Sequence, residues 1–274
     1  MQDILNLLVR FRDGEEPCAI ATVVETRGSV SARTGSKAVI DCEGKVVAGW
    51  VGGGCAQSTV CHAAIGAMRE GAPQMVDLDL DDEVLGTGMP CGGAMRVYIE
   101  PMMPKPKLWL LGVGRVAECL CQMGALLGFD VIVDDALAEH ERYREASRLI
   151  DDDLDYEKLA PGAADYVVVA TQHKGDHQSM LRALRSPAPF IALIASAKRS
   201  GLVLDYLRQE GISEADLARV HAPAGVDLGA KVPEEIALSV LSEIVLHRRG
   251  GTGEPMRDRL RRRTAGEAVA GATA

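Results

Sequence analysis

The chain has 274 residues, of which 47% are hydrophobic and 25% are charged, and its mean hydropathy is near zero. This composition excludes a largely disordered chain, and the length suits one large domain or two smaller ones. No apolar run in the sequence approaches the roughly 18 residues that cross a bilayer, and the N-terminal segment MQDILNLLVRF has the pattern of an amphipathic helix and not of a secretory signal. We therefore expect a cytoplasmic protein without a membrane span.

Charge and cysteine content narrow the class of partner. The formal net charge is −9, and the last 27 residues hold seven arginines against three acids, so the rest of the chain is more acidic still. A negatively charged body disfavours nucleic acid as a partner. Seven cysteines, an odd number without paired C-x-x-C motifs, predict reduced thiols and neither a disulfide framework nor a structural zinc site.

The first hundred residues predict a domain of mixed helices and strands. A helical pattern over 4–11 precedes the strand-length run CAIATVVE, and two apolar runs around Glu43-Gly44 predict a hairpin over 37–51. Apolar spacing predicts a helix over 55–69, and alternation predicts a strand over 74–80, before the loop GTGMPCGGA and the strand MRVYIE. Three prolines in PMMPKPK mark a linker. We therefore predict an N-terminal α+β domain over 1–101 and a linker over 102–106.

After the linker, strand and helix patterns alternate. The predicted elements are, in order, the strand KLWLLG, a helix over 115–127, the strand FDVIVD, a helix over about 138–150, the strand DYVVVAT, a helix over 177–185, the strand PFIALIAS, a helix over 199–210, the short strand RVHA and a helix that begins at Pro233. This series predicts an α/β fold, a Rossmann-like doubly wound parallel sheet over 107–249. Residues 250–274 are rich in Gly, Ala and Arg, and we expect a disordered tail there.

The clearest standard motif is a G-x-G-x-x-A turn, Gly112-Val113-Gly114-Arg115-Val116-Ala117, between a predicted strand and a predicted helix. Gly112 allows the tight turn, and Gly114 lets a pyrophosphate approach the helix N-terminus. Asp134 ends the next strand, where a carboxylate can accept hydrogen bonds from ribose hydroxyls. The motif favours a nucleotide-related ligand, NAD(P) included, and the alternative is a tight-packing turn in a sheet without a cofactor.

Glycine-rich loops with thiols form a second candidate site. The run Gly52-Gly53-Gly54 places Cys55 at the start of a predicted helix, where the helix N-terminus lowers a thiol pKa and a glycine backbone can fold around an anion. Two further loops resemble it: Pro90-Cys91-Gly92-Gly93 adds a second thiol, and Arg27-Gly28-Ser29 adds a cation. Together they suggest an anionic, thiol-reactive ligand, and the alternative is that glycine turns the chain while cysteine fills the core. We favour packing roles for the other cysteines, predicted within strands or helices: Cys18, Cys42, Cys61, Cys119 and Cys121.

Loops after the third and fourth parallel strands add polar groups at the sheet edge where open α/β sheets bind ligands. Thr171, Gln172 and Asp176 follow the third strand, and they either touch a ligand or cap the next helix. We favour that interpretation over a metal site built on the histidines nearby. Ser196 and Lys198 follow the fourth strand and are candidates for binding phosphate, with a solvated charge pair as the alternative.

These motifs, in this order, resemble the XdhC/CoxI family of molybdenum-cofactor maturation and insertion proteins. The resemblance covers about residues 10 to 247 and rests on ETRGSVSARTGSKAVI, GWVGGGCAQS, PCGGAMRVYIEP, LLGVGRVAECL, VVVATQHKGD, FIALIASAKR and APAGVDLGAKVPEEIALSVLSEI. It implies a homodimeric, two-part chain that binds the molybdenum cofactor, a molybdopterin in its simple or dinucleotide form. It further implies sulfuration of that cofactor with a cysteine desulfurase and insertion into a molybdenum hydroxylase of the xanthine dehydrogenase or carbon monoxide dehydrogenase type.

The resemblance gives some residues a role and puts others in doubt. Cys55 and Cys91 become the candidate catalytic residues and the candidate ligands of molybdenum or sulfur. The chain departs from many relatives at Arg115, where they have His, and over 171–176, where they have a T-H-x-H-x-x-D-like run. That departure weakens a metal or acid–base role for these positions and favours binding of phosphate by Arg115.

Three functions stay open at this stage. We favour a cofactor-binding maturation chaperone over an enzyme. An NAD(P)-dependent oxidoreductase would use the same glycine fingerprint, but the sequence offers no convincing proton-transfer residue beside it. A scaffold that bridges a cysteine desulfurase and a hydroxylase would need no pocket. Under the first function we expect the two halves to share one ligand, with the pterin end near Cys55 and Cys91 and any nucleotide end near Gly112, Gly114 and Asp134.

Overall fold

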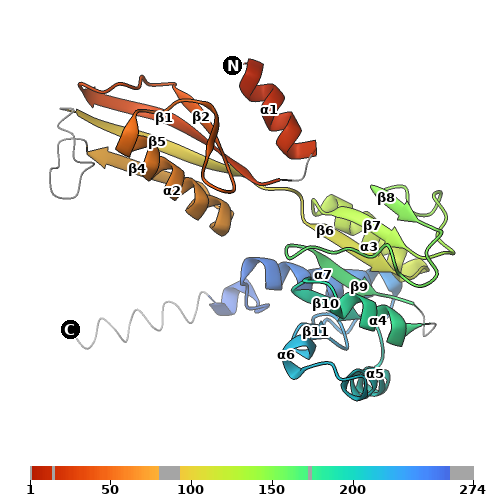
Figure 1. Ribbon diagram of the computed structural model, residues 1–274. Helices are drawn as coiled ribbons and strands as arrows, with labels where there is room; N and C mark the ends of the chain where they lie inside the picture. The colour runs from red at the N-terminus through yellow and green to blue at the C-terminus, as the bar shows by residue number, and fades with distance from the viewer. Residues whose placement is uncertain (1, 14–15, 80–92, 172–174, 260–274) are drawn as a thin grey trace, which may run out of the picture. The chain divides into compact units, whose positions relative to one another are not determined.

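The computed structural model describes residues 2–13, 16–79, 93–171 and 175–259. The chain divides into two compact units, Met1–Lys105 and Pro106–Ala274, each described by itself below (Figure 1). Within the described ranges, no helix combines the length and the apolar character that a membrane crossing requires.

Unit 1 is an antiparallel sheet with a helix on one face. Its strands run in the order β3-β2-β1-β5-β4. Val60 and Ala64 of the helix α2 pack with Ala21 and Val97 of the inner strands, so the core of unit 1 lies between α2 and the sheet (Figure 1). The elements of unit 1 are α1 (Gln2–Asp13), β1 (Cys18–Gly28), β2 (Lys37–Asp41), β3 (Val46–Gly49), α2 (Gly54–Glu70), β4 (Gln74–Asp79) and β5 (Gly93–Met102).

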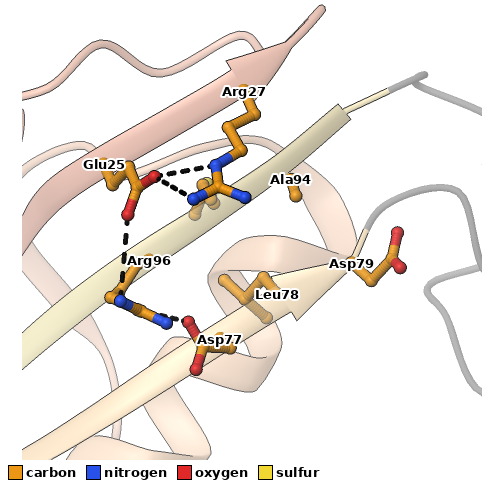
Figure 2. A pocket seen from close by; sticks show the side chains of 8 residues that line it. Glu25, Arg27, Asp77, Leu78, Asp79, Ala94 and Arg96 are labelled. Atoms are coloured by element: carbon orange, nitrogen blue, oxygen red, sulfur yellow. Dashed lines mark hydrogen bonds and ion pairs between the residues drawn. The ribbon is translucent and has the colours of Figure 1, made fainter.

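A β-bulge in β1 decides which charged side chains share a face of this sheet. The pairing of β1 with β5 shifts by one residue between Val23 and Glu25, which places Glu25 opposite Arg96. On the other side of β5, Asp77 of β4 lies opposite the same arginine. Because neighbours of Arg96 such as Val97 pack toward α2, the row of Glu25, Arg96 and Asp77 faces away from the helix (Figure 2).

Unit 2 is a doubly wound parallel sheet, as the alternating pattern predicts. Its strands run in the order β11-β10-β9-β6-β7-β8, and all the pairings are parallel. Leu108 and Leu110 of β6 pack with α3 and α7 on one face, and Trp109 and Leu111 pack with α4 and α5 on the other. The elements are β6 (Lys107–Leu111), α3 (Arg115–Leu126), β7 (Asp130–Asp134), β8 (Arg148–Ile150), β9 (Tyr166–Val169), α4 (Asp176–Leu184), β10 (Phe190–Leu193), α5 (Ala197–Gln209), α6 (Glu214–Leu217), β11 (Val220–His221) and α7 (Pro233–Arg249).

The predicted helix over about 138–150 is wrong. The segment forms successive turns, in which the amides of Ala138, Arg142 and Ala146 each donate to the carbonyl three residues before them, and it ends in the strand β8. Tyr143 is buried in the core cluster between the sheet and α3, and this anchor holds the segment against the sheet. Tertiary packing therefore overrides the helix propensity of a sequence rich in Ala and Glu.

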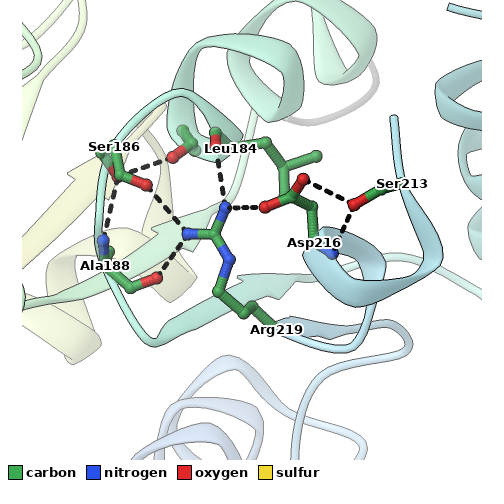
Figure 3. Close-up of polar contacts among 7 residues, drawn as sticks. Leu184, Ser186, Ala188, Ser213, Asp216 and Arg219 are labelled. Atoms are coloured by element: carbon green, nitrogen blue, oxygen red, sulfur yellow. Dashed lines mark hydrogen bonds and ion pairs between the residues drawn. The ribbon is translucent and has the colours of Figure 1, made fainter. Parts of the chain in front are cut away.

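An arginine fastens the far edge of the unit 2 sheet to α4. The Arg219 guanidinium donates to the carbonyls of Ser186, Ala188 and Leu184 at 2.7–2.8 Å, and to the Asp216 carboxylate at 2.9 Å (Figure 3). The Leu184 carbonyl belongs to the last turn of α4, where helical carbonyls lack partners within the helix. Arg219 thus supplies a structural cap and takes no part in the candidate sites below.

The chain is also described for part of the predicted tail. Helix α7 ends at Gly250, which has a φ of 66°, and the amide of Arg259 donates to the carbonyl of Pro255 at 3.3 Å. The remainder of the predicted tail, 260–274, lies outside the described residues.

Candidate functional site

Two of the predicted glycine-rich loops meet at one end of the unit 1 sheet. Gly28, the last residue of β1, lies opposite Gly93, the first residue of β5. A Cβ atom on Gly93 would lie 2.5 Å from the carbonyl oxygen of Arg27 and 3.0 Å from the amide nitrogen of Ser29. Only glycine therefore lets these two segments approach so closely. The segment Arg27–Ser29 and the start of β5 thus form one end of the candidate site.

The third glycine segment reaches the same end of the sheet. A Cβ atom on Gly52, whose φ is 133°, would lie 3.2 Å from the Cβ of Ala56 and 3.6 Å from the Cε of Met95, and Met95 is two residues beyond Gly93. No described atom lies within 4 Å of a Cβ built on Gly53 or Gly54. The run of three glycines therefore packs on β5 at its start and borders open space at its end.

Helix α2 begins within this run, at Gly54. Its N-cap residue is Gly53, and among the described residues no side chain caps the first turn. Backbone N–H groups of such a turn attract anions. The backbone of Cys55 belongs to this turn, and a thiol there is expected to have a lowered pKa. The side chain of Cys55, together with Cys91 and Gly92, lies outside the described residues, so the roles of these three residues remain predictions.

Three other thiols are in environments that raise the thiol pKa. Burial raises the pKa of Cys18 to about 11 and that of Cys121 to about 12. Burial also raises the pKa of Cys119, which is 2% exposed. Packing explains these three cysteines, as predicted. Cys42 does not fit that expectation, because it is exposed in the turn between β2 and β3.

A charged groove of about 250 Å³ lies on the open face of the sheet, beside the same glycines. Figure 2 shows Arg27 and Arg96 turned toward Glu25: the Arg27 Nη2 atom is 2.7 Å from Glu25 Oε1, and Arg96 Nη1 is 3.8 Å from Glu25 Oε2. Arg96 Nε also donates to Asp77 Oδ1 at 2.5 Å, which lowers the pKa of Asp77. Asp79 is the third carboxylate of the groove. Because both arginines are paired with carboxylates, the groove does not present the uncompensated cation that the sequence suggested for Arg27.

In unit 2, close packing accounts for the first glycine of the G-x-G-x-x-A turn. Gly112 has a φ of 108°, and a Cβ there would lie 2.5 Å from the carbonyl oxygen of Ala170, at the end of β9. β6 and β9 are adjacent central strands, and the chain adds further strands on both sides of them. Ligands in this fold usually bind at the carboxyl ends of such a strand pair. Gly114, with a φ of 115°, donates its N–H to the Tyr143 hydroxyl at 3.1 Å. The chain itself therefore takes up one donor of the predicted phosphate site.

Arg115 is likewise engaged within unit 2. Its Nη2 and Nε atoms lie 2.7 and 3.0 Å from Glu234 Oε1, and Nη1 lies 3.4 Å from Glu118 Oε2. These bonds raise the pKa of the guanidinium and connect α3 with the first turn of α7. A phosphate bound by Arg115 would have to compete with Glu234.

Asp134 is fully buried, and neither carboxylate oxygen has a hydrogen-bond partner among the described residues. Burial raises its pKa to about 7, and the charge of Asp153 contributes. In β7, Ile132 packs on the sheet face that α4 and α5 cover. Asp134 is two residues further along the strand, so its side chain is on the same face. In this conformation the carboxyl group is not exposed to a ribose.

The loop groups after β9 and β10 form a polar cluster. The Thr171 hydroxyl donates to Asp176, and Arg199 Nε donates to the other oxygen of Asp176 at 2.7 Å. Ser196 caps α5 by accepting the amide of Arg199 at 3.3 Å, and Lys198 is exposed. Gln172 lies outside the described residues. No group of His, Cys, Asp and Glu side chains suited to a metal ion occurs in the described part of the chain.

Sequence reasoning missed two of these side chains. Arg199 lies next to the predicted Lys198 and was not singled out, although its position three residues after the capping Ser196 is a signal that it lies in the first turn of α5. Tyr143 carries no motif at all, because its contact with Gly114 depends on how the turns over 135–147 pack. The structure describes each unit separately, so a ligand shared between them stays a prediction.

The chain is a two-unit protein, in which an α+β unit with glycine loops at one sheet end precedes a Rossmann-type unit. Residues 11–79 match the model of the XdhC and CoxI family, and residues 108–244 match the model of the XdhC Rossmann domain. The chain therefore belongs to the XdhC and CoxI family.

Three relatives illustrate this membership. The chain is 32% identical over 250 residues to the uncharacterized protein YqeB of Escherichia coli, covering 89% of this chain and 46% of YqeB. It is 32% identical over 162 residues to a Bacillus subtilis protein named as a probable subunit of xanthine dehydrogenase, covering 56% of this chain and 46% of that protein. It is 20% identical to the molybdenum cofactor insertion chaperone PaoD of Escherichia coli, covering 88% of this chain and 86% of PaoD. The chain thus spans about half the length of the first two relatives.

Proposed function

We propose that this chain binds the molybdenum cofactor as its cargo and takes part in the maturation of a molybdenum hydroxylase. The observation that carries the proposal is the gathering of three glycine-bearing segments at one end of the unit 1 sheet, beside the first turn of α2, which no described side chain caps. Membership in the XdhC and CoxI family supports it, and so does the likeness to a relative named as a molybdenum cofactor insertion chaperone.

The chemistry of this end of the sheet suits such a cargo. The cofactor is a phosphorylated, sulfur-rich anion, and the N-terminus of α2 attracts anions. A thiolate at Cys55 is a soft ligand of the kind that binds sulfur-loving metals, and Cys91 would supply a second. The carboxylates of Asp77 and Asp79 in the neighbouring groove can accept hydrogen bonds from the amino-pyrimidine edge of a pterin.

Several finer steps belong to the same proposal. A cysteine desulfurase supplies the sulfur for the cofactor while this chain holds it. A hydroxylase of the xanthine dehydrogenase or carbon monoxide dehydrogenase type then receives it. The protein acts as a cytoplasmic homodimer, and it is a chaperone for the cofactor and not a catalyst of hydroxylation.

A second candidate function is nucleotide binding by unit 2. It is favoured by the position of the Gly112–Ala117 turn, at the carboxyl ends of two central parallel strands. The ligand would be the nucleotide part of a dinucleotide-form cofactor, or NAD(P). The engaged state of Gly114 and Arg115 counts against it, because Tyr143 and Glu234 would have to give way.

Cofactor retention by a cysteine variant tests the principal proposal. The full chain is purified without oxygen after incubation with molybdenum cofactor, and molybdenum and pterin are measured per chain. Cys55→Ser is expected to retain at least about tenfold less of both, since serine is a poor ligand for a soft metal centre. Cys61→Ser is the matched control, because it makes the same substitution later in the same helix, and it should retain as much as the natural chain.

Two results would contradict this assignment. Equal retention by Cys55→Ser and the natural chain would remove Cys55 from the site. Retention of no cofactor by the natural chain, in a preparation with an intact circular dichroism spectrum, would overturn the proposed function as a whole.

A further inference from the structure

Unit 2 carries an apolar groove that lies outside the candidate sites described above. It has a volume of about 540 Å³ and lies between the end of α3, the loop before α7, and α7 itself. Exposed apolar side chains border it, and we call this surface the α3–α7 groove: Leu126 and Leu127 on and after α3, Leu228 in the loop, and Leu238 and Val245 on α7. Leu126 is 87% exposed and Leu238 is 51% exposed. Contiguous exposed apolar surface of this kind is typical of an interaction site.

Helix α7 places its exposed apolar residues in a regular stripe. Glu235, Leu238, Ser242, Val245 and Arg249 follow one another at spacings of three and four residues, so they lie along one face of the helix. Glu235, Leu238, Val245 and Arg249 are exposed, and Ser242, in the middle of the stripe, is half-buried. This spacing is that of the contact positions in paired helices. The stripe therefore has the pattern of a helix that packs against another helix.

Charge makes the stripe complementary to itself. Glu234 and Glu235 occupy the first turn of α7, and Arg248 and Arg249 the last. A two-fold axis near Ser242 would set α7 antiparallel to α7 of a second copy, with Glu235 of each chain facing Arg249 of the other. A parallel arrangement would instead bring like charges together. Antiparallel pairing also places each helix N-terminus beside a C-terminus, which the helix dipoles favour.

The centre of the stripe is suited to burial in such a pair. Ser242 is small, and its hydroxyl already donates to the carbonyl of Leu238 at 2.7 Å, so burial leaves no donor without a partner. Glu235 accepts the amides of Lys231 and Val232, which holds its carboxylate at the end of the helix. Leu238 would then lie near Val245 of the second copy, with the leucines of α3 and the loop at the sides.

We infer that the α3–α7 groove is the surface on which a second copy of this chain docks, through antiparallel contact of the two α7 helices. The self-complementary charge of α7 favours a second copy over an unrelated partner, because a two-fold axis satisfies both ends with one pair of residues. The inference rests on the homodimer of the proposed function, for which it supplies the interface, and it does not depend on what unit 1 binds.

Sedimentation of the full chain and two leucine variants tests the inference. The natural chain is expected to be a dimer at micromolar concentration. Leu238→Glu would bury a carboxylate at the centre of the contact and should raise the dissociation constant at least about 30-fold. Leu202→Glu is the matched control, because Leu202 is similarly exposed on α5 and belongs to a different surface. It should leave the dimer unchanged, and circular dichroism would check the fold of both variants.

A cross-link locates the axis. Ser242→Cys, treated with a short bismaleimide, should give a covalent dimer whose peptides join position 242 to position 242, whereas Leu202→Cys should give none through position 202. Cys42 is also exposed and can react with the bismaleimide, and peptide mapping separates its products from those joined through position 242. A monomeric natural chain, a Leu238→Glu dimer as tight as the natural one, or cross-links that avoid position 242 would each overturn the inference. A monomeric Leu238→Glu variant that still retains molybdenum cofactor would leave the proposed function intact.

Discussion

The two glycine-rich turns of this chain differ in how the chain itself uses them. In unit 2, Gly112 packs against the backbone of Ala170, Gly114 donates to Tyr143, and Arg115 is paired with Glu234. In unit 1, no described atom beyond the chain neighbours of Gly53 lies within 4 Å of a Cβ built there, and no described side chain caps the helix that follows it. The first turn is filled by its own protein, whereas the second leaves backbone groups available to a ligand.

This difference shows that one sequence pattern can answer two physical needs. A glycine run is required where two backbones must approach closely, and it is equally required where a backbone must approach a ligand. Gly112 meets the first need in unit 2. Gly93 meets it in unit 1, where it lets β5 reach Arg27 and Ser29, but the purpose of the neighbouring open run is not explained by packing. Variants that separate the two needs can therefore test whether the two turns differ in this way.

The largest loss of stability is expected from Gly112→Ala. The added Cβ would lie 2.5 Å from a backbone oxygen that cannot move without β9, at a φ that alanine rarely adopts, so unit 2 should lose about 3 kcal/mol of stability. Denaturant unfolding followed by circular dichroism measures the loss.

Gly53→Ala is the matched control for this change, with a φ of −88° and no described atom within 4 Å of the new Cβ. It should alter stability by less than about 0.5 kcal/mol. If both variants were equally stable, the contrast between a filled turn and an open one would be lost.

A gain of stability that depends on pH is expected from Asp134→Asn. The folded pKa of Asp134 is about 7, above the ordinary 3.8, so the folded state binds more protons than the unfolded state between these values. Stability therefore falls as the pH rises from about 4 to about 7, and the neutral amide removes that loss. The full pKa difference corresponds to about 4 kcal/mol, so the variant should be more stable than the natural chain by about that amount at pH 8, and about equal to it at pH 4.

Thermal or denaturant unfolding at both pH values decides the point. A variant less stable than the natural chain at pH 8 would show that the carboxylate has a partner worth more than its burial costs. Titration with NAD(H) adds a second readout: binding lost in Asp134→Asn, at unchanged fold, would assign the residue to a ribose after all.

The smallest effect is expected from Glu234→Gln. This change weakens the hold on Arg115 and leaves its guanidinium available at the start of α3. Inorganic pyrophosphate, used as a probe, should then bind to the full-length Glu234→Gln variant about three- to tenfold more tightly than to the natural chain. Isothermal titration measures the change, and Glu235→Gln controls for the lost charge. Equal affinities in all three proteins would show that the turn is not an anion site.

Much of the fold follows from hydrophobic patterning alone. The strands of unit 2 are short apolar runs because both of their faces are covered, and the helices between them show one apolar face, so the doubly wound sheet could be predicted. Helix ends were predictable to within about two residues, because Gly, Pro and capping side chains mark them locally. The helix predicted over about 138–150 was wrong, because burial of the single side chain Tyr143 outweighs the helix propensity of its neighbours.

Less of the candidate site could be predicted. Sequence spacing identified Gly52, Gly93 and Arg27 as members of loops with a common character. It could not show that Glu25 would lie beside Arg96, because that contact depends on a one-residue bulge in β1. Nor could it show that Asp134 would lie inside the protein, since its place at the end of a strand says nothing about what covers it.

The order of most elements, the two-unit character of the chain and its family could be predicted from local patterns, because apolar periodicity and glycine spacing are local properties of a chain. The tertiary structure alone decided which polar groups are engaged: Arg115 with Glu234, Gly114 with Tyr143 and Arg96 with Asp77. These partners are separated by 19 to 119 residues along the chain. Their contacts exist only because packing brings distant segments together, and no local pattern encodes the distance between two side chains.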